Sequence, residues 1–476
     1  MPTLKKLLPI VAILLIAWAL LTIRIGAAWT GHHDANGAWT SVAVRNWQWH
    51  GFLNGMVIYN EGFDPAERFE YYTHHPPFSA YLAAPLVLLA GFDEALIRFP
   101  SAAVTLISAA ALYVLVRRLS NARRAAWAAL LYALTPMIGY FGRMPNYEAP
   151  GLMFTLLFAA VLVQWIKTPT RARWIALATL VVGIVWTAWA ADMIAALLGV
   201  VALLTVRPSR RIAVIALGVV GAVALFAMIA LFAANYPAAL DELRGMFLFR
   251  TSDASLAPGS APFTWGDYIV RQLGRFITLF TPTILALALI GAPGILRERK
   301  SRPVLIALLL GGLAYILLFR NAAYVHDYYA IYLTIPLAIS AAAAITPVRR
   351  ARSRWARPLV VALILATPIP ALVYLSQLHA SADGDQVLQV AAVVHDNSEP
   401  GSIILSNLPD TGWAMGFYAE RSVEWLISPA DAIQRANASE VPTYYLYCDE
   451  YSTLPADAPI VREIDINADC RLALLR

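Results

Sequence analysis

Long apolar runs alternate with short polar segments over most of this chain. A helix needs about 20 apolar residues to cross a bilayer. Runs of about that length occupy eleven places: 7–25, 94–116, 124–142, 148–166, 174–190, 192–206, 212–234, 275–296, 303–319, 328–346 and 358–376. A shorter apolar stretch at 77–91 begins at a Pro-Pro pair, so we expect a juxtamembrane or re-entrant helix there. The pattern predicts an α-helical polytopic membrane protein with about 11 spans and juxtamembrane helices.

Composition and charge support this interpretation. The chain is 59% hydrophobic and 14% charged, whereas soluble domains carry about 25% charged residues. The net charge is +6, and the basic residues cluster between the apolar runs, at 5–6, 117–124, 167–173, 207–211, 297–302 and 349–357. Lys and Arg collect in cytoplasmic loops, so the N-terminus is predicted to be cytoplasmic. We expect a multi-pass protein of a cell inner or plasma membrane that binds membrane lipids and no nucleic acid.

Polar residues gather in the segments on the opposite side of the predicted membrane. These segments are 26–76, 143–147, 235–274, 320–327 and the tail from 377. All eight histidines of the chain lie in them, and the loops with basic clusters contain none. We therefore expect the working face to be extracytoplasmic.

The first outer segment is about 50 residues long, which is too long for a passive connection. Within it, "WTSVAVRNWQWHGF" at 39–52 is typical of a helix that lies in the membrane interface.

The tail has the composition of a soluble domain. "DQVLQVAAVVHDNSEPGSIILSN" predicts an amphipathic helix, a Pro-Gly turn and a buried strand, while "TYYLYC" and "RLALL" predict further strands and "ADAIQRA" a helix. The prediction is a transmembrane domain over 1–376 and a small extracytoplasmic α/β domain over 377–476. Cys448 and Cys470, the two cysteines of the chain, both lie in this tail, and the sequence leaves open whether they form a disulfide.

Acids, imidazoles, arginine and tyrosine recur where the apolar runs meet the outer segments. These residues are Asp34, His74, His75, Arg143, Glu148, His326, Asp327 and Tyr329. Cations of this kind hold phosphate, and a carboxylate takes a proton from an acceptor, so the set suits the handling of an anionic lipid headgroup. A carboxylate with histidines also suits Mn²⁺ or Zn²⁺, which leaves a divalent cation as an alternative, but no spacing matches a zinc motif such as HExxH. We assign no metal ligands.

The layout resembles the GT-C-fold glycosyltransferases, in particular the protein O-mannosyltransferases and the aminoarabinose transferase of lipid A. Those enzymes carry an acidic residue early in the first outer loop, the place of Asp34 in "HHDANGAW". They carry a Lys-Pro-Pro or His-Pro-Pro element, matched by His75 and the two prolines after it. "RFPS" at 98–101 and Glu148 match two further elements, and Tyr329 lies seven residues before Pro336 as in the family.

Several positions depart from the family pattern. Asp34 is followed by Ala35, whereas many relatives have Asp-Glu, so one carboxylate carries over. The family lysine becomes His75, whose positive charge depends on pH. The Thr-Lys-Gly element of some relatives has no counterpart in "WTAWAADM", where Asp192 stands at an outer turn with an open role. These departures concern the identity of the donor sugar more than the class of reaction.

The resemblance implies a membrane glycosyltransferase that uses a polyprenyl-phosphate sugar, a hexose or pentose, and inverts the anomeric carbon. Asp34 is the expected general base toward the hydroxyl of a glycan, lipid or protein acceptor, and Glu148 orients the acceptor or shares the proton transfer. The lipid phosphate is expected to meet His75, Arg250 and Tyr329. The other substrate-binding candidates are His74, His326 and Arg143.

Other interpretations of these residues stay open at this stage. Asp34 and Glu148 also suit plain helix caps, and Arg250 suits an interfacial arginine that reaches lipid phosphates. A flippase or transporter for a lipid-linked sugar would gather similar charges, but in broken helices at the bilayer midplane. A non-catalytic assembly protein would tolerate loss of Asp34. An enzyme using a nucleotide sugar is disfavoured, because such donors are cytosolic and the polar residues lie outside.

Overall fold

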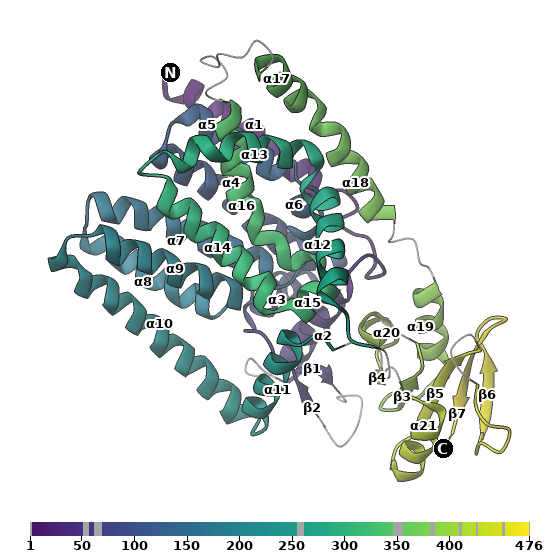
Figure 1. Ribbon diagram of the computed structural model, residues 1–476. Coiled ribbons are helices and arrows are strands. Elements are labelled where there is room, and N and C mark those ends of the chain that lie inside the picture. Colours follow the sequence, from purple (N-terminus) through teal and green to yellow (C-terminus); the bar gives the residue numbers. More distant parts are fainter. Residues whose placement is uncertain are drawn as a thin grey trace. The chain divides into compact units, whose positions relative to one another are not determined.

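The computed structural model describes most of the chain as two compact units (Figure 1). The described residues are 2–50, 57–60, 69–254, 261–345, 356–380, 386–408, 412–424, 427–449 and 453–475. The first unit comprises Met1–Ile25, Thr73–Ser79 and Arg98–Gln377, and the second comprises Gly26–Tyr72, Ala80–Ile97 and Leu378–Arg476. The C-terminal segment thus shares a unit with most of the first outer loop. The predicted division into domains at residue 377 stays a prediction.

The first unit is built from helices, and each predicted apolar run falls on one helix or on two consecutive helices. They are α1 (Pro2–Leu21), α4 (Glu94–Leu119), α5 (Ala122–Ala133), α6 (Pro136–Phe141), α7 (Glu148–Lys167), α8 (Arg171–Val185), α9 (Trp189–Thr205), α10 (Pro208–Asn235), α11 (Ala239–Thr251), α12 (Trp265–Phe280), α13 (Pro282–Leu296), α14 (Arg302–Leu318), α15 (Arg320–Val325), the 3-10 helix η2 (Asp327–Leu333), α16 (Thr334–Ile345), α17 (Ala356–Ala366) and α18 (Pro368–Ala380). The predicted helical class is therefore confirmed.

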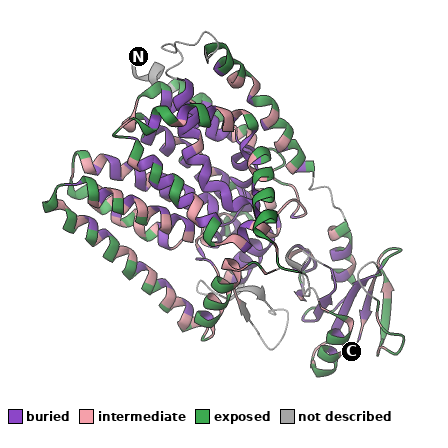
Figure 2. Ribbon diagram, in the orientation of Figure 1, coloured by how far each residue is buried: buried purple, intermediate pink, exposed green. Residues whose placement is uncertain are grey.

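Length and apolarity identify the helices that can cross a membrane. Among the described residues, five helical stretches are long and apolar enough on their own, and a bent pair raises the number to six. The shorter apolar helices include α9 and α14. Helices α10 and α17–α18 have few buried residues, whereas η2 and α16 are almost fully enclosed by other helices (Figure 2). The exposed apolar helices present the surface expected to face lipid.

The bent pair corrects one prediction. The run at 275–296 was expected to be a single span, but α12 ends at Phe280 and α13 starts at Pro282 at an angle of 96°. Thr281 between them has a φ of 65°, a left-handed conformation that interrupts a helix, and proline is favoured at a first helical position. A sequence read only for hydrophobicity does not show this corner.

Three of the basic clusters meet on one side of the first unit. Arg124 forms an ion pair with Glu298 at 2.6 Å, which joins the loop at 117–124 to the loop at 297–302. Lys167 donates a hydrogen bond to the carbonyl of Arg118 at 2.9 Å. The loops that the charge pattern assigned to one membrane face therefore contact one another.

The second unit combines short helices with a five-stranded sheet. Its first part contains α2 (Ala35–His50), β1 (Val57–Asn60), β2 (Phe69–Tyr71) and α3 (Phe78–Ala90), and its second part contains α19 (Gln386–Asn397), β3 (Ile403–Ser406), α20 (Gly412–Ala419), β4 (Ser422–Glu424), α21 (Pro429–Ala438), β5 (Thr443–Cys448), β6 (Arg462–Asp465) and β7 (Cys470–Leu474). At 13 residues, α3 is about 20 Å long and too short to span a membrane, as the sequence predicts.

The large sheet has the strand order β4-β3-β5-β7-β6. Strands β4, β3 and β5 run parallel, and β7 pairs antiparallel with both β5 and β6. Alternate residues of β5 point to opposite faces: Tyr444 and Leu446 pack with α19 and α20, whereas Tyr445 and Tyr447 pack with α21. This three-layer arrangement confirms the small α/β fold predicted for the tail.

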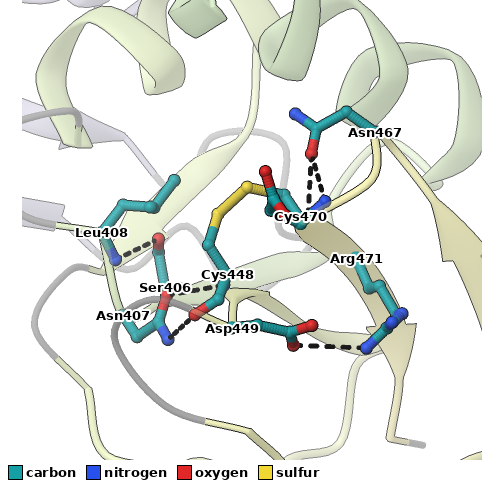
Figure 3. The surroundings of a disulfide bond; sticks show 9 residues. Ser406, Asn407, Leu408, Cys448, Asp449, Asn467, Cys470 and Arg471 are labelled. Carbon is teal, nitrogen blue, oxygen red and sulfur yellow. Dashed lines mark hydrogen bonds and ion pairs between the residues drawn. A yellow bond between two sulfur atoms is a disulfide. The ribbon is translucent and has the colours of Figure 1, made fainter.

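A disulfide closes the end of this sheet (Figure 3). Cys448 ends β5 and Cys470 begins β7, where the two residues pair directly across the strands and bond to each other. The Asn407 side chain accepts from the backbone N–H of Cys448 at 3.2 Å and donates to its carbonyl at 3.4 Å. The disulfide answers the question that the sequence left open about these two cysteines, and the outer location of the tail stays a prediction.

Within the second unit, the first outer loop packs against the C-terminal segment. Tyr418 of α20 donates a hydrogen bond to Glu94 at 2.6 Å and accepts one from the backbone N–H of Trp29 at 2.8 Å. Trp39 of α2 is buried and stacks on Tyr72 with a ring separation of 4.8 Å. The expected helix is present. The prediction that it lies in the membrane interface is wrong for Trp39, because this side chain is buried in a protein core. Residues 51 and 52 of the predicted helix lie outside the described residues.

Candidate active site

His75 and Arg250 meet in the first unit although 175 positions separate them. His75 lies in the short loop before α3 and is buried, and Arg250 lies in the last turn of α11. Nη1 of Arg250 contacts Nε2 of His75. A guanidinium only donates hydrogen bonds, so Nε2 is the acceptor and the imidazole carries its proton on Nδ1. The position where the resemblance implies a lysine thus holds a neutral ring that contacts an arginine.

The surroundings of His75 keep it neutral. Burial lowers the pKa of His75 well below its usual 6.5, and electrostatic interactions with Arg250, His74 and His326 lower it further. Burial and Arg250 lower the pKa of His74 to about 4. At neutral pH the positive charge among His74, His75 and Arg250 is therefore carried by Arg250.

Stacked aromatic rings extend from His75 into the helices. The imidazole lies 3.5 Å from the ring of Tyr147 with an angle of 12° between the planes. The hydroxyls of Tyr147 and Tyr329 are 3.5 Å apart, and Tyr329 stacks on Tyr315 with a ring separation of 4.7 Å. The His326 ring lies 5.9 Å from Tyr329. All of these rings except the half-buried His326 are buried, and their stacking holds His75 and Tyr329 in place.

Glu148 lies at the far end of these rings. It is the first residue of α7 and is completely buried. Its Oε1 accepts a hydrogen bond from Tyr315 at 3.3 Å, and its backbone N–H donates to Asn146 at 3.0 Å. A plain cap would be solvated, whereas Glu148 is enclosed and connected through tyrosines to His75. The enclosed position agrees with the functional interpretation, and its catalytic role stays a prediction.

A large cavity lies beside His74 and Arg250. Its volume is about 1120 Å³, more than the 300–1,000 Å³ typical of small-molecule sites, and α7 to α11 supply most of its wall. The wall is apolar except near His74, Asp192, Arg244 and Arg250. The shape and lining suit a ligand with a long apolar part and an anionic or polar head.

The remaining candidates have separate positions. Arg143 is buried, donates to the carbonyl of Ile23 at the end of α1, and lies 5.5 Å from the ring centre of Tyr140. These contacts favour a role in helix packing. Asp34 belongs to the second unit, where it directly precedes α2 and its Oδ2 accepts from the backbone N–H of Gly31 at 3.1 Å. It is buried rather than a solvated cap.

Sequence reasoning missed several residues of this site. Tyr147 and Tyr315 were not singled out, because aromatic residues inside apolar runs look like ordinary core. Tyr147 had one available signal, since it stands directly before Glu148 in "PNYEAP". Trp189 was also missed, although its Nε1 donates to the His74 carbonyl at 2.8 Å and so fixes the start of α9 beside the site.

The lowered histidine pKa values predict an acid-side loss of stability. The unfolded chain protonates these rings near 6.5, but the folded protein resists protonation down to about 4 at His74 and lower at His75. The contribution of these rings to the free energy of unfolding is therefore fully present above pH 6.5. At lower pH the free energy of unfolding decreases by up to about 1.4 kcal/mol per pH unit for each ring. Thermal unfolding in detergent between pH 6.5 and 5 should show a falling midpoint. The double variant His74→Asn, His75→Asn should flatten this slope, and an unchanged slope would contradict the assignment.

Comparison with known proteins places the fold. The family of dolichyl-phosphate-mannose-protein mannosyltransferases matches residues 74–232, about a third of the chain. No curated protein matches it in sequence.

Solved structures match over nearly the whole chain. ArnT from Cupriavidus metallidurans, bound to undecaprenyl phosphate, has a TM-score of 0.64 at 15% identity and covers 100% of this chain and 99% of its own. The oligosaccharyltransferase of Archaeoglobus fulgidus, tethered to an acceptor peptide, has a TM-score of 0.58 at 14% identity, covering 94% of this chain and 69% of its own. Arabinofuranosyltransferase AftD from Mycobacteria has a TM-score of 0.55 at 13% identity, covering 99% and 40%. These relatives are glycosyltransferases, and the chain is a multi-pass membrane protein with their GT-C fold.

Proposed function

We propose that this protein transfers a sugar from a polyprenyl-phosphate-linked donor to an acceptor hydroxyl at the outer face of the membrane, with inversion. The observation that carries the proposal is the cavity of about 1120 Å³, whose apolar wall leads to Arg250 and His74. An isoprenoid chain is apolar throughout and suits such a wall, and its phosphate suits a guanidinium. The similar ArnT structure was obtained with undecaprenyl phosphate, a molecule of this kind.

The proposed reaction is a single displacement at the anomeric carbon. The acceptor oxygen attacks the anomeric carbon while its proton passes to the carboxylate of Asp34. The bond between the anomeric carbon and the phosphate oxygen breaks, and that oxygen takes the electron pair. The phosphodiester leaves as a phosphate monoester with one additional negative charge.

The residues around Arg250 supply what this step requires. A fixed guanidinium at the leaving oxygen stabilises the charge that develops there. His75 accepts a hydrogen bond from Arg250 and leaves its positive charge intact, because the imidazole is neutral. In this proposal Tyr329 donates a hydrogen bond to the phosphate, and Glu148 orients the acceptor. The role of Asp34 as the general base is supported by the resemblance to the family motif and by its burial before α2.

A donor panel tests the function. Membranes of the native host with the gene deleted or restored are given polyprenyl phosphates carrying radiolabelled hexoses or pentoses, with and without EDTA. We expect label from one donor to enter a glycan, lipid or protein fraction only when the gene is present. The EDTA arm tests the divalent-cation alternative. Movement of intact donor across the bilayer without transfer would instead identify a flippase and overturn the proposal.

A further inference from the structure

We propose that Asp192 binds the sugar of the donor through hydrogen bonds from its hydroxyl groups, and thereby determines which sugar is accepted. The inference rests on the proposed function and assigns a role to a residue that the family motifs leave without one.

Asp192 lies on the cavity wall close to the predicted phosphate position. It belongs to the first turn of α9, three residues after Trp189, so both side chains are on the same side of the helix. Both residues line the cavity together with His74 and Arg250. The hydrogen bond from Trp189 Nε1 to the His74 carbonyl, at 2.8 Å, ties this turn to the loop that carries His75. Asp192 and Arg250 thus line the same cavity.

Among the described residues, no side chain donates a hydrogen bond to the Asp192 carboxylate. Among the described residues that line the cavity Asp192 is the only acid, and within the described part of the chain its carboxylate forms no hydrogen bond and no ion pair, while its backbone N–H bonds to the Ala188 carbonyl. Its charge does interact with Tyr332, which also interacts with Glu148. A carboxylate in an apolar wall is costly unless donors satisfy it, and an ionisable group inside a membrane protein commonly marks a substrate site.

The donor has three parts, and only one of them suits Asp192. The isoprenoid chain offers no hydrogen-bond donors. The phosphodiester accepts hydrogen bonds and is negative, so a carboxylate repels it. The sugar carries several hydroxyl donors, and the two oxygens of one carboxylate can accept from neighbouring hydroxyls.

Trp189 provides the second element of such a site. Its indole N–H is already bonded to His74, which holds the ring on the cavity wall beside Asp192. An apolar ring next to a carboxylate matches the two surfaces of a sugar, whose C–H face is apolar and whose edge carries hydroxyls. With the phosphate at Arg250, the sugar then lies on the α9 side.

A site built to bond a hydroxyl rejects analogues that lack it. The test compares wild type with Asp192→Asn and Asp192→Ala in nanodiscs, using the polyprenyl-phosphate sugar that wild type transfers best. We expect KM for this donor to rise about 10- to 100-fold in Asp192→Ala, as for lost hydrogen bonds to a charged group. Monodeoxy donors lacking the bonded hydroxyl should be poor substrates of wild type, and the variant should discriminate against them less.

Binding of undecaprenyl phosphate without a sugar separates a sugar contact from a folding defect. Its Kd should stay unchanged or fall in both Asp192 variants, because a like charge has been removed. Asp241→Asn is the matched control, since Asp241 is an exposed acid in the first turn of α11 and does not line the cavity. Equal weakening of the sugar-bearing and sugar-free lipids, or a donor KM like that of the control, would overturn the inference.

The same binding assay keeps this inference distinct from the proposed function. If wild type transfers no sugar at all, binding of undecaprenyl-phosphate mannose is compared with that of undecaprenyl phosphate. A preference for the sugar-bearing lipid that Asp192→Ala abolishes supports the sugar contact even though the transferase proposal has failed. Absence of that preference in wild type overturns the inference.

Discussion

Replacing Asp34 with asparagine is expected to lower the initial rate of sugar transfer by about 10²- to 10⁴-fold, the contribution of a general base. Asparagine keeps the size of the side chain and an oxygen that can accept from the Gly31 N–H, so the turn before α2 should survive. What it loses is the ability to take the acceptor proton. The measurement is transfer from the radiolabelled donor in membranes containing equal amounts of each variant.

Asp93→Asn is the matched control for Asp34→Asn. Asp93 lies in the same unit and accepts hydrogen bonds from the backbone N–H groups of Ala95 and Leu96 at the start of α4. An asparagine cap retains most of this stabilisation, so the control should transfer sugar at nearly the wild-type rate. Wild-type transfer by Asp34→Asn would remove Asp34 from the mechanism and direct attention to Glu148.

Replacing Arg250 with alanine is the second large effect. We expect kcat to fall about 10²- to 10³-fold, as when one preorganised donor to a developing negative charge is lost. Arg250→Lys keeps the charge but not the planar guanidinium, so an intermediate loss is expected. Rates at saturating donor separate this effect on the chemical step from an effect on donor binding.

Arg244→Ala controls for the general loss of positive charge. Arg244 lies on the same helix and lines the same cavity, but it is exposed and its contacts do not include His75. Its removal should raise KM modestly and leave kcat nearly unchanged. Equal losses in the two variants would show that the cavity uses a diffuse positive field and that the contact with His75 has no special part.

Much of the helical architecture could be predicted, because each membrane span requires an apolar run of a characteristic length in the sequence. The strands of the tail were predictable for a similar reason, since β3 and β5 are apolar runs bounded by turn residues. The corner at Thr281 and the packing of α2 against α20 could not be predicted. The first depends on the conformation of one residue. The second depends on contacts such as the hydrogen bond from Arg45 of α2 to the Phe417 carbonyl of α20, 372 positions away.

The site was predictable only where the family motif names a residue. His75, Glu148 and Tyr329 followed from spacing around prolines and span ends. Arg250 had only its approximate position in a loop, and the structure places it against His75. Tyr315, which connects these residues, gave no sequence signal, because a ring that orders a site and a ring that fills a core have the same apolar neighbours along the chain.

The hydrogen bond from Arg250 to a neutral histidine also bears on how the catalytic cycle ends. A guanidinium placed to meet growing negative charge binds a dianion more strongly than a monoanion. On the proposed mechanism, the spent lipid phosphate is therefore held more tightly than the donor it came from. Turnover would then be limited by departure of the used carrier, and its accumulation in the membrane would slow the enzyme while donor is still plentiful.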